Sequence, residues 1–211
     1  MIEVLIADDH PMVLRGLAGI LADTPDIRAA GEANSGAEVL AQIRARNFDV
    51  VTLDLDMPGL SGLELLKQVR LVKPRLPVLV VSIYPEEQYA LRCLKAGASG
   101  YLNKSSAPEE LVVAVRALAA GRSCMTAAMS ERMSRTLQRP KADVLPHEQL
   151  SEREYEVMLL LARGLSVSEL GEKLFLSERT VSILRARILQ KTGWESDAQI
   201  MRYVSEHGLD G

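Results

Sequence analysis

Hydrophobic and polar positions alternate along residues 1–120 in a way that predicts five strands, each followed by a helix. Short apolar runs such as Val78–Val81 are apolar on both faces, as in a parallel sheet covered by helices on each side. The longer stretches between them repeat apolar residues every three to four positions, which is typical of amphipathic helices. We expect strands near 2–7, 27–33, 49–54, 77–82 and 99–103, and helices near 11–22, 36–46, 62–73, 86–97 and 108–120. This alternation predicts a doubly wound, flavodoxin-like α/β fold with the strand order 2-1-3-4-5.

The strand pattern stops near residue 148, and short helices follow one another from there on. Serines that can cap helices stand at 151, 166, 177 and 196, and all except Ser177 are followed three residues later by Glu or Gln, the spacing of a capping box. Gly164 and Gly193 stand where helix ends need a left-handed residue. The sequence therefore predicts a small all-α domain over 148–211.

Residues 121–147 separate the two patterns and mix turn residues with apolar ones. Met125, Met129, Met133 and Leu137 recur at spacings of four, which predicts one short amphipathic helix. Such a helix packs on its own domain or forms a contact between domains or copies. We therefore expect domains at 1–120 and 148–211, joined by a linker over 121–147.

Composition and charge narrow the function classes. The net charge is −3, and residues 148–211 carry 8 Lys and Arg against 11 Asp and Glu, so a nucleic-acid surface must be a local patch. Two cysteines, Cys93 and Cys124, form no zinc or disulfide pattern. No apolar stretch approaches the roughly 18 residues of a membrane span, and no signal peptide is evident. We expect a cytoplasmic protein without a membrane partner.

Three carboxylates follow neighbouring strands of the predicted sheet. Asp8 and Asp9 end the first strand, and Asp54 ends the third. Because these strands are adjacent in the 2-1-3-4-5 order, their carboxylates converge and raise the cost of ionising one another unless a cation is present. Oxygen-rich clusters of this kind suit Mg²⁺.

Two further strand ends complete this chemistry. Ser82 ends the fourth strand with a hydroxyl, and Lys104 follows the fifth with a point charge suited to a phosphoryl oxygen. A carboxylate nucleophile, a metal, a hydroxyl and a lysine together describe an aspartyl-phosphate site.

The segments IADDHP, LDLDMPGLSG, VVS and GYLNK, in this order, resemble the receiver domain of two-component response regulators. The segment from Leu150 to Gly193 is similar to the helix-turn-helix of the NarL/FixJ (LuxR-type) family. This resemblance implies that Asp54 accepts a phosphoryl group from a histidine kinase. The implied metal ligands are Asp9, Asp54 and the Asp56 carbonyl, with support from Asp8; the implied phosphoryl contacts are Ser82 and Lys104, and Tyr101 is the aromatic that turns inward when Ser82 moves.

Two positions depart from the pattern of the family. Ser105 follows Lys104 where many receivers carry a cis proline, and Ile83 replaces the small residue common after Ser82. The rates of phosphotransfer or dephosphorylation are therefore expected to differ from those of other members.

The segment 165–188 is predicted to form two helices joined by a tight turn, an arrangement that places the second helix in a major groove. On a helical wheel Val181, Leu184 and Ile188 share a buried face. The candidate DNA contacts on and around the opposite face are Arg179, Thr180, Ser182, Ile183, Arg185, Ala186, Arg187 and Lys191.

Base reading by this helix is expected to be modest. Ser182, Ile183 and Ala186 match base-contacting positions of the family, and none carries a bidentate donor for guanine or adenine. An outward Ile183 suits a thymine methyl group, which favours A·T pairs and readout of DNA shape.

The predicted function is a phosphorylation-controlled transcription regulator that binds promoter DNA as a homodimer and is not an enzyme. One alternative is a regulator whose helices act on protein partners instead of DNA. A second alternative, a phosphatase of the haloacid dehalogenase type, shares the DxD of LDLDMPG. That family places the DxD strand first, whereas here Asp8 and Asp9 precede it.

Overall fold

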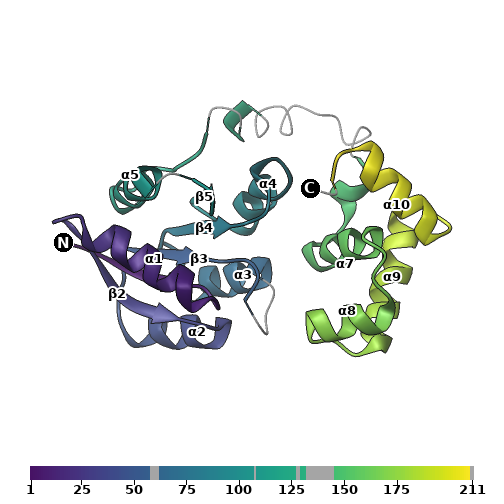
Figure 1. Ribbon diagram of the computed structural model, residues 1–211, viewed down its shortest axis with the longest axis horizontal. Coiled ribbons are helices and arrows are strands. Elements are labelled where there is room, and N and C mark those ends of the chain that lie inside the picture. Colours follow the sequence, from purple (N-terminus) through teal and green to yellow (C-terminus); the bar gives the residue numbers. More distant parts are fainter. Residues whose placement is uncertain (58–61, 107, 127–128, 132–144, 210–211) are drawn as a thin grey trace. The chain divides into compact units, whose positions relative to one another are not determined.

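The computed structural model describes residues 1–57, 62–106, 108–126, 129–131 and 145–209 (Figure 1). The chain forms two compact units, Met1–Met133 and Ser134–Gly211, and this division falls inside the segment interpreted as a linker. Most of the short helix predicted from Met125 to Leu137 lies outside the described residues. The domain limits at 120 and 148 therefore remain predictions.

The N-terminal unit contains a five-stranded parallel sheet with the order β2-β1-β3-β4-β5, which confirms the predicted topology. Its strands are β1 (Ile2–Ala7), β2 (Ile27–Ala33), β3 (Val50–Leu53), β4 (Val78–Ser82) and β5 (Gly100–Asn103). The last three begin one residue later than expected. All residues of β3 and β4 are buried, as the apolar runs predict for strands covered on both faces.

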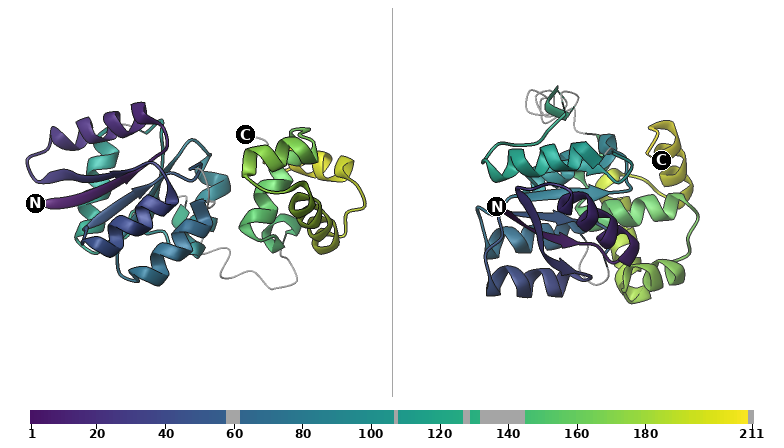
Figure 2. Two further views of the ribbon diagram at one scale, coloured as in Figure 1. Left: turned by 90° about the horizontal axis from the view of Figure 1, so that it is seen from below. Right: turned by 60° about the vertical axis from the view of Figure 1, so that its left-hand side comes forward.

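Five helices alternate with these strands. They are α1 (Pro11–Ala22), α2 (Gly36–Ala45), α3 (Gly62–Val72), α4 (Glu86–Ala96) and α5 (Pro108–Ala119). Helices α1 and α5 cover one face of the sheet, and α2, α3 and α4 cover the other (Figures 1 and 2). The α1 and α5 face packs Leu14, Leu111 and Val115 against Ile6 and Val81. Each such buried side chain contributes about 1.5–3 kcal/mol, so the strand ends rest on a rigid frame.

The C-terminal unit is all-helical in its described part. It consists of the short 3₁₀ turn η2 (Pro146–Gln149) and the helices α7 (Glu152–Ala162), α8 (Val167–Leu174), α9 (Glu178–Thr192) and α10 (Asp197–Glu206). Helix α7 packs against α9 and α10, and α8 packs against α9. Val181 and Ile188 of α9 are fully buried, as the helical wheel predicts, whereas Leu184 is half-buried.

Capping residues set the ends of these helices. The capping boxes predicted at Ser151 and Ser166 are confirmed. Ser177 also caps its helix, because its Oγ accepts a hydrogen bond from the Thr180 N–H at 3.1 Å. The capping box predicted for Ser196 is wrong, because its side chain makes no cap hydrogen bond. The side chain of Gln199 reaches one residue further back and accepts a hydrogen bond from the Glu195 N–H at 2.7 Å.

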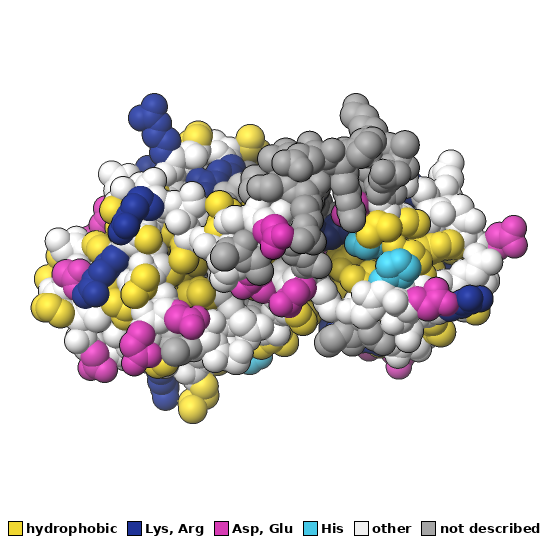
Figure 3. Space-filling view, turned by 90° about the horizontal axis from the view of Figure 1, so that it is seen from above, with side chains coloured by type: hydrophobic (Ala, Val, Ile, Leu, Met, Phe, Trp, Pro, Cys, Tyr) yellow, Lys and Arg dark blue, Asp and Glu magenta, His cyan; other side chains and the backbone are white. Residues whose placement is uncertain are grey.

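Two histidines belong to an aromatic cluster in this unit. His147 Nδ1 lies 2.8 Å from the Tyr203 hydroxyl, and the His207 ring stacks on Tyr203 with centroids 3.9 Å apart. Trp194 lies against the same tyrosine at 4.7 Å. Figure 3 shows histidine side chains among apolar ones in this unit. These contacts indicate a packing role for both histidines.

None of the described helices combines the length and the apolar character that crossing a membrane requires.

Candidate phosphorylation site and DNA-binding surface

The carboxylates of the N-terminal unit are brought together by the pairing of β1 with β3. Ala7 is the register partner of Leu53, and the Asp54 N–H donates to the Ala7 carbonyl at 2.9 Å. Asp8 and Asp54 therefore leave adjacent strands side by side, as the sheet order predicts.

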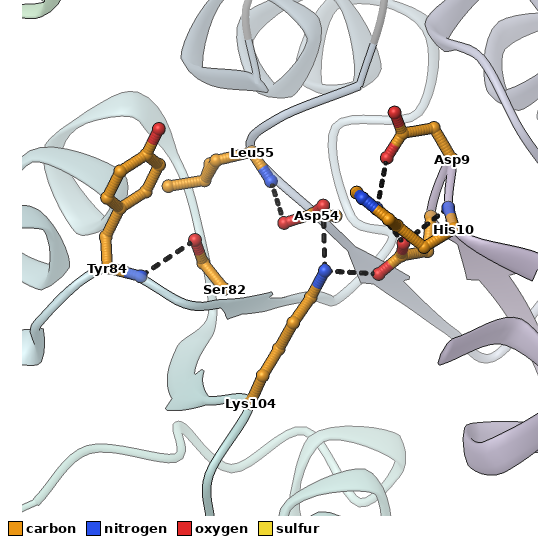
Figure 4. Close-up of polar contacts among 8 residues, drawn as sticks. Asp9, His10, Asp54, Leu55, Ser82, Tyr84 and Lys104 are labelled. Atoms are coloured by element: carbon orange, nitrogen blue, oxygen red, sulfur yellow. Dashed lines mark hydrogen bonds and ion pairs between the residues drawn. The ribbon is translucent and has the colours of Figure 1, made fainter. Parts of the chain in front are cut away.

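Lys104 joins the two buried carboxylates. Asp8 is 1% exposed and Asp54 is 2% exposed. The Lys104 Nζ lies 2.6 Å from Asp8 Oδ2 and 2.9 Å from Asp54 Oδ2 (Figure 4). One ammonium thus offsets part of the cost of two carboxylates taken out of water.

The protonation equilibria of these groups reflect burial and pairing. Burial raises the pKa of Asp54 above its ordinary value, against the opposing effect of Lys104. Burial alone would lower the pKa of Lys104, but hydrogen bonds to Asp8 and Asp54 outweigh it and raise that pKa. The ammonium therefore stays charged, and the site still carries more carboxylates than cations.

Asp9 supplies an oxygen that the protein leaves unsatisfied. Its Oδ1 is buried and accepts no hydrogen bond of good geometry, although His10 Nδ1 lies 2.8 Å away. Ligand atoms of Asp8, Asp9, His10 and Asp54 all lie within 4.8 Å of one another. One cation can therefore reach several carboxylates, and this acidic pocket is consistent with a metal site. The exposed side chain of Asp56 stands outside this group.

The second oxygen of Asp54 is held by its own loop. Asp54 Oδ1 accepts a hydrogen bond from the Leu55 N–H at 2.8 Å. The Leu55 carbonyl in turn accepts from Gly62 N–H at 3.1 Å, and a Cβ at Gly62 would lie 2.4 Å from the Leu55 Cα. Sequence reasoning missed Gly62, because its role depends on a close backbone approach that no periodic pattern reveals.

Ser82 and Tyr101 lie beside the pocket and share the loop after β4. Both are buried, and the Ser82 Oγ accepts a hydrogen bond from the Tyr84 N–H at 3.3 Å. The Tyr101 hydroxyl donates to the Tyr84 carbonyl at 2.8 Å. The Tyr101 side chain therefore points into the protein and is anchored to the loop after β4. Ile83 lies between Ser82 and Tyr84 in the sequence, and its side chain is 63% exposed.

Lys104 reaches the acidic pocket although Ser105, and not a proline, follows it in the sequence. The Lys104 N–H donates to the Ser82 carbonyl at 2.8 Å, which continues the pairing of β4 with β5. The Ser105 N–H and hydroxyl both donate to Asn103 Oδ1, at 2.9 and 2.7 Å. No peptide bond in the described part of the chain is cis. This local turn takes the place of the proline that many receivers carry.

In the C-terminal unit, α9 presents much of the predicted contact face to solvent. Its N-terminal half follows a tight turn after α8 in which Phe175 is left-handed, with φ 54°. The exposed members of the predicted set are Arg179, Thr180, Ser182, Ile183, Ala186, Arg187 and Lys191. Ile183 is 46% exposed, so the structure leaves it apolar and accessible.

Two of the predicted basic contacts are engaged inside the unit. The Arg185 guanidinium lies 2.7 Å from Asp197 Oδ1, and Lys191 Nζ lies 2.7 Å from Glu154 Oε2. Both acids lie outside α9, 12 and 37 positions away from their basic partners, so the charges of the helix alone do not predict these pairs. Among the described residues, Arg179 and Arg187 form no ion pair with a carboxylate and keep their charge available for phosphate.

Glu154 is 2% exposed and links α7 to α9. Burial alone would raise the pKa of this carboxyl, but hydrogen bonds from Lys191 and Ser151 lower it below its ordinary value of 4.5. Because its pKa is lower in the folded chain, the ionised Glu154 carboxylate adds fully to the free energy of unfolding at pH values above its unfolded-state pKa. This contribution is lost as the pH falls through the lower folded-state pKa.

Glu154→Gln is therefore expected to lower the unfolding free energy at pH 7 by about 1–2 kcal/mol, the value being limited by the partial exposure of Lys191. Urea unfolding followed by the fluorescence of Trp194, the single tryptophan, measures this change. The difference between the two proteins should shrink below pH 4.5. A difference that stays constant down to pH 3 would contradict this role.

Comparisons with known proteins agree with this geometry. Residues 4–116 match the response regulator receiver domain, and residues 148–204 match the bacterial regulatory proteins of the luxR family. The response regulator UvrY of Escherichia coli is 34% identical over 209 residues, covering 99% of this chain and 96% of UvrY. GacA of Pseudomonas aeruginosa is also 34% identical, covering 99% and 98%.

A solved structure supports the same assignment. RcsB from Salmonella enterica serovar Typhimurium, bound to promoter rprA in the presence of the phosphomimetic BeF₃⁻, superimposes with a TM-score of 0.68 at 28% identity, covering 97% of this chain and 99% of RcsB. A receiver followed by a LuxR-type domain is the organisation of a phosphorylation-controlled transcription regulator, not of an enzyme. The chain belongs to the response regulators of the NarL/FixJ family.

Proposed function

We propose that this chain accepts a phosphoryl group on Asp54 from a sensor histidine kinase and thereby controls its binding to promoter DNA. The observation that carries the proposal is the placement of Asp54, buried at the end of β3 with the Lys104 ammonium 2.9 Å from its Oδ2. In the transfer, an Asp54 oxygen forms the bond to phosphorus while the bond from phosphorus to the kinase histidine breaks. Lys104 and the Ser82 hydroxyl then hold the phosphoryl oxygens.

The proposed cofactor is Mg²⁺, held by Asp8, Asp9, Asp54 and the Asp56 carbonyl. The unsatisfied Asp9 oxygen and the convergence of carboxylates support this assignment. When bound, the ion would neutralise charge on the carboxylates and on the incoming phosphoryl group.

Asp9→Ala is expected to weaken Mg²⁺ binding by about tenfold or more, because a charged ligand is lost from the pocket. Calorimetric titration of the full chain with MgCl₂ measures the affinity without any phosphodonor. Asp56→Asn is the matched control, since only the backbone carbonyl of that residue is assigned to the ion. Equal affinities in wild type and Asp9→Ala would remove Asp9 from the metal site.

The proposed target is promoter DNA, bound by a homodimer through the exposed face of α9. Arg179 and Arg187 are exposed and make no ion pair with any described residue, and they support this surface together with the accessible Ile183. RcsB offers a precedent, since it is seen bound to promoter rprA and as two dimers on two parallel DNAs. A two-fold dimer would place two copies of α9 in successive major grooves. Because the chain would receive its phosphoryl group from a kinase inside the cell, we propose that it acts in the cytoplasm.

A gel-shift titration with promoter fragments tests the function. The chain treated with acetyl phosphate and Mg²⁺ should bind selected fragments more tightly than the untreated chain, with affinity falling steeply as salt rises. The Asp54→Asn chain should show no response to acetyl phosphate. Salt-independent or absent binding to every fragment would instead favour the alternative in which the helices contact a protein partner.

A further inference from the structure

After α5 the chain turns back along the open edge of β5. Cys124 forms a parallel bridge with Gly100, and the Cys124 N–H donates to the Ser99 carbonyl at 3.1 Å. A Cβ at Gly100 would lie 2.8 Å from the Cys124 carbonyl oxygen, so only glycine allows this approach. We name the described residues 122–126 and Met129 the strap.

The strap is fastened a second time at the start of α4. The Thr126 hydroxyl donates to the carboxylate of Glu86, the first residue of that helix, and accepts from the Met129 N–H at 3.1 Å. Met129 is 3% exposed. Two hydrogen-bonded points and one buried side chain thus hold the beginning of the linker on the N-terminal unit.

Both fastening points adjoin the residues expected to respond to phosphorylation. Glu86 is four residues after Ser82, and the Tyr84 N–H between them donates to Ser82 (Figure 4). The Tyr84 carbonyl accepts from the Tyr101 hydroxyl. The Tyr84 ring also stacks on Tyr89 of α4 with centroids 4.5 Å apart, so this loop and the start of α4 move together. The other fastening point, Gly100, directly precedes Tyr101 in β5.

We propose that phosphorylation of Asp54 releases the strap, so that the linker reports the state of the phosphorylation site to the C-terminal unit. The Ser82 hydroxyl can donate a hydrogen bond to a charged phosphoryl oxygen, and this bond is stronger than the 3.3 Å bond that its oxygen accepts from the Tyr84 N–H. Turning Ser82 toward Asp54 breaks its bond to Tyr84 and loosens the loop that leads to Glu86. The bond from Thr126 to Glu86 is lost, and the strap then leaves the edge of β5.

The proposal rests on phosphorylation of Asp54, and Cys124 offers a reporter for it. This thiol belongs to the strap and is half-buried against the core of the N-terminal unit, and burial together with the carboxylates of Glu110 and Glu86 raises its pKa. Since alkylating reagents attack the thiolate, the docked thiol reacts slowly and the released one faster. Cys93 is fully buried in the core and reports global opening in the same sample.

The experiment measures iodoacetamide alkylation of both cysteines by peptide mass spectrometry, in the full chain with and without acetyl phosphate and Mg²⁺. Phosphorylation should accelerate alkylation of Cys124 by about fivefold or more, the change expected when one ordinary hydrogen bond is lost from an opening equilibrium. Cys93 should stay protected. Asp54→Asn should abolish the acceleration.

Two variants test the fastening itself without a phosphodonor. Thr126→Val keeps the shape and removes the hydroxyl, and it should bring the alkylation rate of Cys124 in the untreated chain to that of the phosphorylated chain. Ser123→Ala, which removes another hydroxyl from the strap, should leave that rate unchanged.

Equal alkylation rates of Cys124 in the phosphorylated and untreated chains, or in Thr126→Val and wild type, would overturn the proposed release of the strap. Failure to form any phosphoryl adduct, seen in the intact mass, would instead overturn the proposed function, and the Thr126→Val comparison would still decide whether the hydroxyl holds the strap.

Discussion

Asp54→Asn is expected to abolish phosphoryl transfer to this chain while leaving the fold intact. The amide has no nucleophilic oxygen of comparable strength, so no aspartyl phosphate can form. Its oxygen can still accept the hydrogen bond that Asp54 receives from Leu55, and Lys104 keeps Asp8 at 2.6 Å as a charged partner. Intact-protein mass spectrometry after incubation with acetyl phosphate and Mg²⁺ measures the loss of the adduct.

The stability of Asp54→Asn follows from the direction of the pKa shift. Burial raises the pKa of Asp54, so the folded chain favours the protonated form, and stability is lost as pH rises from the unfolded-state pKa to the higher folded-state pKa. At pH 7 the ionised carboxylate therefore costs stability. The neutral amide should leave the thermal midpoint of the apoprotein unchanged or higher.

Asp56→Asn provides the control for the phosphorylation experiment. Asp56 is exposed and two residues from Asp54, and its substitution preserves the backbone carbonyl assigned to the metal. The control should therefore be phosphorylated like wild type. Retention of the adduct in Asp54→Asn, or its loss in Asp56→Asn, would move the acceptor away from Asp54.

The sheet and its acidic edge could be predicted from sequence because both depend on local signals. Buried strands such as β3 and β4 are short and apolar on both faces, and the order of a doubly wound sheet then places Asp8 beside Asp54. Ser82 and Lys104 follow the same rule, since each stands at the end of its strand. No tertiary information is needed for these placements.

Contacts between distant segments could not be predicted in this way. The bond from Lys191 to Glu154 joins residues 37 positions apart, and that from Thr126 to Glu86 joins residues 40 apart. A wheel drawn for α9 alone counts Lys191 as an available cation, whereas a buried carboxylate on α7 already pairs with it. The capping box at Ser196 failed because Gln199 has an alternative donor one residue earlier at Glu195.

The pairing of charges on α9 changes which residues should govern DNA affinity. Arg187 is exposed and makes no ion pair among the described residues, whereas Lys191 is held by Glu154 at 2.7 Å. Arg187→Ala is therefore expected to weaken binding to all sequences alike and to reduce the slope of log affinity against log salt by about one. Lys191→Ala, the matched control, should leave that slope nearly unchanged and lower the unfolding free energy, because it leaves Glu154 unpaired.

Ile183→Ala is expected to act on specificity instead of on affinity for all sequences. Ile183 is 46% exposed on a helix face whose other outward residues include Ser182 and Ala186, and none of the three can donate two hydrogen bonds to a purine. An apolar side chain there gains from contact with a thymine methyl group, so the substitution should reduce discrimination at one or two A·T positions by at most about 3 kcal/mol. Selection of sites from random DNA by the phosphorylated chain and by the variant measures this change. A strong guanine-specific half-site that Ile183→Ala leaves unaltered would show that sequence is read by other residues.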